Sequence, residues 1–408
     1  MAPTIVAIVV FVLALGARVD IPFEDHSEGD EVLYAALVQQ LEDGRGYTLQ
    51  GHPILKEPWV AREQYDRPLF HHPPGAIALF WALHHAFGRY GFGLAQLFSF
   101  SVFYWSMLAL GRLVLREWSV VACVALSGLA GFTPIVAHVH THYWLDGPQV
   151  AFVTAGSALY LLALRRRRLG WAVAAGAMMA WACATKMNAV LVLPGVVALG
   201  WSVDPESPPR GLVVPTAVCA GIVTVVLAAW AWVEWSNFGE VLPSWAGKPA
   251  PDLVAMNRFV RFVTTVRGPW SYLRLLPQAM ATLVPALVAF PLLWSDRRSR
   301  RIAFVLSAWI AGILLVHVAL GYVGYSKLLR YVILAVPAAI LLFALAVEAA
   351  LRHLRAPGRR SWAAAFLLLA GIAFTIEVSL GATYVKLYPD RDLIVLYPDT
   401  RMMRSMAR

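Results

Sequence analysis

The chain has 408 residues, of which 59% are hydrophobic and only 14% charged, and its mean hydropathy is +0.63. Soluble globular chains are nearer half apolar and a quarter charged, and no stretch of 100 residues here lacks an apolar run, so a soluble enzyme with a single anchor is a poor alternative. The net charge of +10 does not point to a nucleic-acid partner, because the basic residues form short clusters beside apolar runs, as topology signals do. We therefore expect an all-α, multi-pass protein of a cell membrane, with the bacterial inner or plasma membrane as the best fit.

In chain order, the apolar runs predict about eleven transmembrane helices, several of them shorter than the roughly 20 residues of a typical span. The runs are 2–19, 93–115, 119–137, 148–164, 170–185, 188–203, 211–233, 278–294, 302–323, 331–351 and 362–380. The first run is interpreted as an uncleaved helix and not as a signal peptide, because no basic region precedes it and further spans follow.

Basic clusters between these runs predict which helix ends share a side. The clusters are Arg112 with Arg116 and the runs 165–168, 296–301 and 352–360. All fall on one side, which the positive-inside rule assigns to the cytoplasm. The external side then receives the first loop, 20–92, a second larger loop, 234–277, and the short tail 381–408. The basic residues of this tail would suit the cytoplasm better, and an even number of helices would place it there. Residues 1–380 are expected to form one catalytic membrane domain.

The first external loop contains a predicted amphipathic helix over residues 30–44. Its apolar positions follow the spacing of one helix face, namely Tyr34, Leu37, Val38 and Leu41. Asp30 and Glu31 occupy the first turn, where the helix dipole favours negative charge. We expect this helix to lie along the membrane surface with its apolar face toward the lipid.

Ionisable residues gather on the predicted external side, in the first loop and at the ends of the spans. They are Asp30, Glu31, His71, His72, His138, His140, His142, Asp146, Lys186, Lys327 and Arg330. Charges at span ends are costly unless they are paired or hydrated, so these residues are candidates for a functional site. The alternative is that each one is simply solvated at the membrane surface.

Two groups among these residues suit particular ligands. Lys327 and Arg330 are spaced i, i+3 and can share one helix face. Two cations facing an external cavity suit a phosphate, whereas the alternative is that both snorkel to the interface. His71 and His72 precede a Pro-Pro-Gly break, which holds them rigidly at the start of the next apolar segment.

The stretch HVHTH, residues 138–142, raises a metal hypothesis. If it is extended, His138, His140 and His142 face one way and can hold zinc. If it is helical, only His138 and His142 are neighbours. The two alternatives for a cofactor are therefore none or a divalent cation, and a polar rim on the external side is favoured over a set of metal ligands.

Five motifs in one order resemble a known family. They are GDEVLYAALVQQLEDGRGY at 29–47, HHPPG at 71–75, YWLDGPQVAF at 143–152, ATKMNAVLVLPG at 184–195 and YSKLLRYVILAVPAAIL at 325–341. Each motif alone is weak. Together they resemble the GT-C superfamily of membrane glycosyltransferases over about residues 1–350, and most of all the protein mannosyltransferase and aminoarabinose transferase type of families 39 and 83.

The resemblance implies a multi-span bundle with a large first external loop that bears surface helices. It also implies a sugar donor linked to polyprenyl phosphate and an acceptor that enters from the external side. Residue by residue, the match places the family's acidic residues at Asp30 and Asp146, its basic residue before Pro-Pro at His72, and its late basic motif at Lys327 and Arg330. The sequence departs from the family at His72, a weaker cation than lysine near neutral pH, and in having Gly75 where an apolar residue is common.

The expected function is transfer of a hexosyl or pentosyl group from the donor to a hydroxyl of a lipid, glycan or protein acceptor, with inversion at the anomeric carbon. Asp30 is the expected general base, with a pKa raised by desolvation, and Glu31 and Asp146 complete the catalytic candidates. The substrate-binding candidates are His71, His72, Lys186, Lys327, Arg330 and Tyr331. The alternatives are a lipid-linked sugar transporter or flippase, a hydrolase, and a metal-dependent oligosaccharyl-type transferase. The sequence has no inverted repeat of the kind that transporters often carry.

Overall fold

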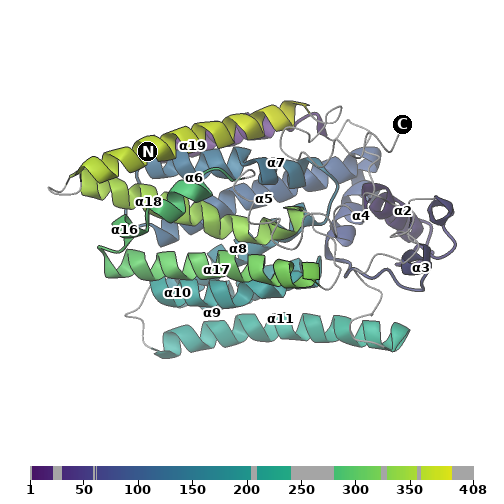
Figure 1. Cartoon of the computed structure of the whole chain (residues 1–408). Helices are drawn as coiled ribbons and strands as arrows, with labels where there is room; N and C mark the ends of the chain where they lie inside the picture. Colours follow the sequence, from purple (N-terminus) through teal and green to yellow (C-terminus); the bar gives the residue numbers. More distant parts are fainter. Residues whose placement is uncertain are drawn as a thin grey trace.

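The computed structural model describes residues 2–21, 30–57, 60, 62–203, 209–239, 280–322, 329–355 and 360–387, and every regular element among them is a helix (Figure 1). The long helices are α5 (Gly91–Val114), α8 (Asp146–Arg166), α11 (Pro209–Phe238), α17 (Arg297–Tyr322), α18 (Val336–Leu354) and α19 (Arg360–Leu387). The shorter helices of the bundle are α1 (Ala2–Gly16), α4 (Gly75–Phe87), α6 (Val120–Phe132), α7 (Pro134–Thr141), α9 (Leu169–Cys183), α10 (Leu193–Val203), α15 (Leu283–Val288) and α16 (Phe290–Leu293), with 3-10 turns η3 (Gly88–Tyr90), η4 (Met187–Val192) and η6 (Leu329–Ala335). One end carries α2 (Asp30–Glu42), η2 (Pro53–Lys56) and α3 (Arg62–Tyr65). The all-α prediction is thus confirmed.

Within the described residues, six helices are long and apolar enough to cross a membrane, or seven if one bent pair is a single span. The predicted count of about eleven is therefore not confirmed. The run 119–137 breaks where Pro134 starts α7, and the axis bends there by 42°, because proline supplies no backbone N–H to a continuing helix. The described part of the run 278–294 forms only the short helices α15 and α16. Residues 75–87 are predicted to belong to the first loop, whereas they form α4 and share one apolar stretch with α5.

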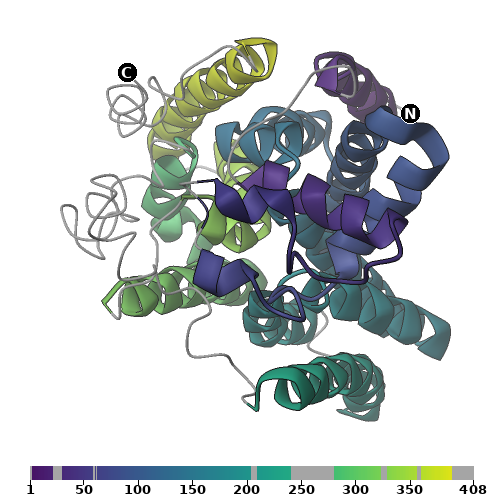
Figure 2. The ribbon, with the colours of Figure 1, turned by 90° about the vertical axis from the view of Figure 1, so that its right-hand side faces the viewer.

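Burial separates the central helices from the peripheral ones. Every residue in the most apolar window of α18 is buried by the rest of the protein, whereas the corresponding share is 17% for α11 and 28% for α19. A helix that is apolar on all sides is stable only within a core or in lipid. Figure 2 accordingly shows α19 and α11 at opposite outer edges of the bundle, where their exposed faces are available to lipid.

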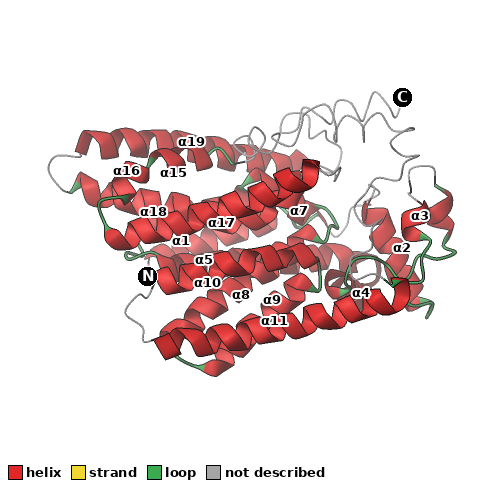
Figure 3. Ribbon diagram, turned by 60° about the horizontal axis from the view of Figure 1, so that its bottom comes forward, coloured by secondary structure: helices red, strands yellow, loops and turns green. Residues whose placement is uncertain are grey.

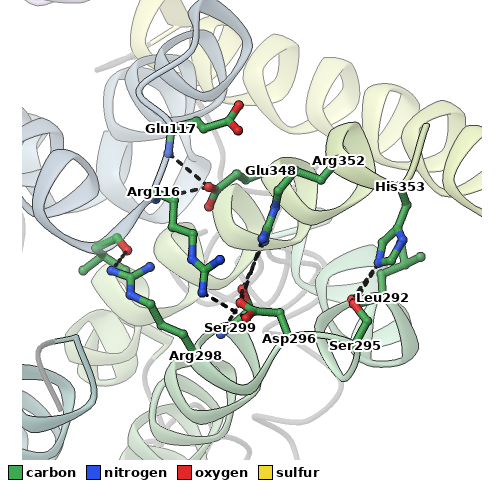
Figure 4. Close-up of polar contacts among 11 residues, drawn as sticks. Arg116, Glu117, Leu292, Ser295, Asp296, Arg298, Ser299, Glu348, Arg352 and His353 are labelled. Carbon is green, nitrogen blue, oxygen red and sulfur yellow. Dashed lines mark hydrogen bonds and ion pairs between the residues drawn. The ribbon is translucent and has the colours of Figure 1, made fainter. Parts of the chain in front are cut away.

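Three of the four basic clusters meet where α17 begins and α18 ends (Figure 4). Arg116 pairs with Asp296 at 2.9 Å, and Arg352 lies 3.9 Å from the same carboxylate. Arg298 donates a hydrogen bond of 2.8 Å to the carbonyl of Val114 at the end of α5. These clusters therefore share one end, as their spacing predicts. The assignment of that end to the cytoplasm stays a prediction.

The helices α2 and α3 lie at the opposite end of the bundle (Figures 1 and 3). The chain turns after α2 at Gly44, whose φ of 70° lies in the left-handed region that glycine adopts easily. The apolar face of α2, including Leu37, packs with Ile77 and Phe80 of α4 in one buried cluster. The expectation that this face lies on lipid is wrong, because α4 and the segment 47–70 cover it with protein.

Candidate functional site

Two carboxylates and two cations form a continuous chain of ion pairs at the end of the bundle that carries α2. The guanidinium of Arg330 donates a hydrogen bond to Asp30, and its Nε lies 3.9 Å from Oδ2 of Asp146. The ammonium of Lys186 lies 2.8 Å from Oδ1 of the same carboxylate. Asp146, Lys186 and Arg330 are buried, whereas 33% of the Asp30 side chain is exposed. Asp30 is thus the accessible member of the chain.

Each of these four residues stands at or beside the end of a helical element. Asp30 and Asp146 begin α2 and α8, where the helix dipole favours a carboxylate. Lys186 lies between α9 and η4, and Arg330 lies in the first turn of η6. The side-chain amide of Gln149 donates to the carbonyl of Lys186 at 3.0 Å. This bond holds the turn at 184–186, the lysine turn, against α8, and so fixes Lys186 relative to Asp146.

A glycine allows the HHPPG turn to approach the lysine turn. The N–H of Gly75 donates to the carbonyl of Ala184 at 2.5 Å. A Cβ at this position would lie 2.7 Å from the backbone of Ala184 and 2.8 Å from the hydroxyl of Thr185. Because side-chain carbons do not approach backbone so closely, the position favours glycine. The departure from the family at Gly75 therefore has a steric reason.

Aromatic rings hold the two cations in place. The guanidinium carbon of Arg330 lies 4.2 Å from the ring centre of Trp144, and the imidazole of His142 stacks on the same indole at 4.0 Å with the planes 19° apart. The ring of Tyr331 lies 5.2 Å from the ammonium of Lys186 and 5.7 Å from the guanidinium. Aromatic faces attract cations without neutralising them. These contacts therefore fix the position of both side chains without adding a counter-charge to those of Asp30 and Asp146.

Glu31 has a different environment from its neighbour Asp30. Its side chain is buried, and its carboxylate accepts a hydrogen bond of 2.7 Å from the backbone N–H of Tyr143. The hydroxyl of Tyr143 in turn donates to the carbonyl of Ile21 at 3.2 Å. These contacts tie α2 to the segment that precedes Asp146.

The two histidines of the HHPPG turn lie in an aromatic pocket beside the ion pairs. Their rings are 4.1 Å apart, the ring of Tyr65 lies 5.5 Å from His71, and the hydroxyl of Tyr47 donates to the carbonyl of His72. Burial lowers the pKa of His71 to about 4, although Asp30 opposes the shift. Burial, the neighbouring His71 and the charge of Lys186 hold the pKa of His72 well below its usual value. Both side chains are therefore neutral at pH 7 and can bind an anion only as N–H donors.

The charge state of Asp30 depends on two opposing influences on its pKa, namely burial and the nearby cations. Burial alone would raise the pKa of its carboxyl, but the charge and hydrogen bond of Arg330, with a further contribution from Lys186, outweigh burial. The pKa of Asp30 consequently lies below its ordinary value. The expectation of a raised pKa is therefore wrong for this arrangement, in which Asp30 is ionised and held as the partner of Arg330.

The stretch 138–142 is mostly helical, so the three histidines do not converge. The ring of His140 packs on Phe103 and its Nδ1–H donates to the carbonyl of Val136 at 3.0 Å, whereas His138 forms a 2.7 Å hydrogen bond with Tyr384. In the described part of the chain no three His, Cys, Asp or Glu side chains are placed as ligands of one metal ion. The three histidines are therefore not arranged as a set of ligands for a divalent cation.

Most of the candidate residues named from the sequence converge here. The group comprises Asp30, Asp146, Lys186, Arg330 and Tyr331, with His71 and His72 within electrostatic reach. Lys327 lies outside the described residues. Trp144 and Gln149 were missed, although the position of Trp144, two residues before Asp146 in the same run, was a usable signal.

The architecture matches solved membrane transferases. Over 94% of its length the chain superposes on ArnT from Cupriavidus metallidurans, an aminoarabinose transferase, with a TM-score of 0.57, 19% identity and 74% of that chain covered. Over 93% of its length it superposes on the archaeal oligosaccharyltransferase AglB from Archaeoglobus fulgidus, solved with an inhibitory peptide and a dolichol-phosphate, with a TM-score of 0.57, 12% identity and 56% of that chain covered. The chain has the GT-C fold.

The likeness to GT-C proteins concerns architecture, since no family model and no curated protein matches the sequence. The chain spans little more than half the length of AglB. The resemblance inferred from the five motifs is thus confirmed for the fold. Within this GT-C fold, the ion pairs of Asp30, Arg330, Asp146 and Lys186 lie opposite the basic end of the bundle.

Proposed function

We propose that this chain is a membrane glycosyltransferase that moves a hexosyl or pentosyl group from a polyprenyl-phosphate donor to a hydroxyl of a lipid, glycan or protein acceptor, at the external face of a bacterial cell membrane. The chain of ion pairs that links Asp30, Arg330, Asp146 and Lys186 carries this proposal. It joins an accessible carboxylate to two cations that can receive a leaving phosphate. The GT-C neighbours support the reaction class, since both are transferases and one was solved with a lipid phosphate.

Arg330 and Lys186 are the proposed phosphate-binding cations. A guanidinium offers two parallel N–H donors to phosphate oxygens, and an ammonium adds a point charge. Asp146 contacts both cations and is itself buried. Its proposed role is to keep both side chains charged and oriented, because an unpaired buried cation is strongly disfavoured. Lys327 keeps its predicted phosphate role, and the neutral His71 and His72 add N–H donors.

In this proposal Arg330 connects donor binding to the strength of the base. Without donor, Arg330 pairs with Asp30 and lowers the pKa of its carboxyl, against the opposing effect of burial. A phosphate between Arg330 and Lys186 competes for the guanidinium. As Arg330 turns toward the phosphate, Asp30 loses the partner that lowers its pKa and becomes a stronger base when the donor is in place.

The chemical step then follows from the position of Asp30 at the accessible edge. Asp30 takes the proton of the acceptor hydroxyl while the hydroxyl oxygen attacks the anomeric carbon. The bond between that carbon and the phosphate oxygen breaks, and the electron pair leaves with the phosphate, where Arg330 and Lys186 stabilise its charge. A single displacement with one base inverts the configuration of the anomeric carbon.

The test is the release of polyprenyl phosphate from a panel of polyprenyl-phosphate sugars, detected by mass spectrometry in the presence of candidate acceptors. Lys186→Met should lower release about 10-fold or more, since a hydrogen bond to a charged group contributes about 1.5–3 kcal/mol. Lys56→Met, a change in η2 of the same external end, is the matched control and should behave like the wild type. Release of free sugar regardless of acceptor would indicate a hydrolase, and movement of labelled lipid without covalent change would indicate a flippase. Either result would contradict the proposal.

A further inference from the structure

A cavity of about 330 Å³ opens at the basic end of the bundle, far from the ion pairs of the candidate site. It lies where α5, α8 and α10 end and α17 begins, and its wall is mostly aliphatic. The lining includes Leu113, Leu161, Leu164 and Val203, with Arg165 and Arg298 as its charged members. The volume is within the range of small-ligand pockets. A wall of this composition suits a hydrocarbon chain with an anionic group at one end.

Arg298 differs from Arg116 and Arg352 in the partner that its guanidinium contacts. Arg116 and Arg352 share the carboxylate of Asp296 (Figure 4). Arg298 instead donates from Nη2 to the carbonyl of Val114, while its Nη1 is buried and has no hydrogen-bond partner. A buried donor without a partner costs free energy. An acceptor oxygen placed in the cavity would remove that cost.

Exposed tryptophans flank the helix ends that form the cavity. Trp171 and Trp294 are exposed and lie within three residues of the basic runs 165–168 and 296–301, and the exposed Trp201 lies near the end of α10. Tryptophan concentrates at the level of the lipid headgroups. If the mouth of the cavity lies at that level, Arg165 and Arg298 meet the lipid headgroups and the aliphatic side chains of the lining meet the acyl chains.

A second cavity, of about 400 Å³, repeats this chemistry close by. Its lining combines Trp294 and Phe304 with Arg300 and Arg301, and the guanidinium of Arg300 lies 5.3 Å from the ring centre of Trp294. Both cavities take residues from the end of α10 and the start of α17. The basic end thus offers two recesses that each combine apolar side chains with two arginines.

We infer that the basic end binds an anionic phospholipid, with an acyl chain in the first cavity and the phosphate between Arg165 and Arg298. Basic pockets between membrane helices recognise anionic headgroups through such complementary charge. This site is independent of the proposed glycosyl transfer, because it shares no residue with the ion pairs of Asp30, Arg330, Asp146 and Lys186. Its occupant would hold α8 and α17 together, since one arginine comes from each helix.

The test measures the affinity of the purified full chain for phosphatidylglycerol and for phosphatidylcholine by native mass spectrometry. The double variant Arg165→Gln with Arg298→Gln should bind phosphatidylglycerol about 25-fold more weakly, because each basic residue near a membrane surface contributes about fivefold in affinity. The matched control is Arg166→Gln with Arg297→Gln. It removes the same charge from the same two helices at exposed neighbours that do not line the cavity. The control should keep the wild-type preference for phosphatidylglycerol.

Equal losses in the two double variants would overturn the inference, because they would show a diffuse surface effect. Competition by inorganic phosphate as effective as competition by the lipid would also overturn it, since the acyl chain would then play no part. If the glutamine variant does not fold, Arg165→Lys with Arg298→Lys replaces it. A folded lysine variant should retain the preference for the anionic lipid, and loss of that preference to the level of phosphatidylcholine would contradict a phosphate held by positive charge.

Discussion

Arg330→Gln removes the cation that contacts both carboxylates while keeping a polar side chain. The lost contacts include the hydrogen bond to Asp30, the 3.9 Å ion pair with Asp146 and the 4.2 Å contact with the ring of Trp144. A hydrogen bond to a charged group contributes about 1.5–3 kcal/mol. A donor phosphate that binds Arg330 with similar strength would lose that amount. The kcat/KM for the donor should then fall about 10-fold to 150-fold, mostly through KM.

The same substitution should move the acid limb of kcat/KM to higher pH, because Arg330 affects the pKa of Asp30. Burial raises the pKa of this carboxyl, and Arg330 is the main influence that outweighs burial and holds the pKa below its ordinary value. The base must be deprotonated to act, so the acid limb of kcat/KM in the wild type lies below the ordinary aspartate value of about 3.9. Without Arg330, burial raises the pKa of Asp30, and the acid limb moves to higher pH.

The assay is the initial rate of donor consumption by purified protein between about pH 4.5 and pH 8. The wild-type profile should be nearly flat over this range, because its acid limb lies below about pH 3.9. Arg45→Gln, an exposed arginine of the first loop, is the matched control, and unfolding temperatures establish that each variant is folded. An unchanged donor KM in folded Arg330→Gln would refute the phosphate contact. An acid limb that stays where it is in the wild type would refute the coupling between Arg330 and Asp30.

Three further substitutions test neighbouring contacts. Trp144→Ala should raise the donor KM about 2-fold to 30-fold, from a cation–π contribution of about 0.5–2 kcal/mol, whereas Trp144→Phe should keep most of the affinity; equal effects would show that the ring face does not hold Arg330. Glu31→Ala leaves the buried N–H of Tyr143 without this acceptor and should cost about 1–3 kcal/mol of stability, seen as a lower Tm, with a smaller loss in Glu31→Gln. His72→Gln should leave the pH profile between about 6 and 8 unchanged, because burial holds the pKa of His72 below that range; a wild-type limb in that range that disappears in the variant would contradict a neutral His72.

Local sequence patterns predicted where helices form more reliably than what packs against those helices. The periodicity of Tyr34, Leu37, Val38 and Leu41 predicted a helix over 30–44, and α2 spans Asp30–Glu42. The pattern shows that one face is apolar but not what covers it, and protein covers the face that was expected to meet lipid. Hydropathy likewise located the apolar runs, but it did not predict that the run 119–137 is bent.

The site was predictable only in part, because its contacts join distant segments. Asp30 and Arg330 are separated by 300 positions, and no local spacing predicts that they meet. Two observations made both residues candidates for one site. The order of the motifs resembles that of GT-C proteins, and both residues lie on the predicted external side. The sign of the pKa shift at Asp30 was mispredicted for the same reason, since it depends on the approach of Arg330. Once HVHTH proved mostly helical, its alternation of histidines no longer described a single face.

The donor turnover of Asp30→Asn, measured beside Asp43→Asn, tests the proposed mechanism most directly. Both variants replace one aspartate at an end of α2, since Asp30 begins this helix and Asp43 directly follows it. General base catalysis typically contributes about 10²-fold to 10⁴-fold. Release of polyprenyl phosphate should fall by that factor in folded Asp30→Asn and stay near the wild-type rate in Asp43→Asn. Near-normal release by folded Asp30→Asn would contradict the assignment of Asp30 as the base.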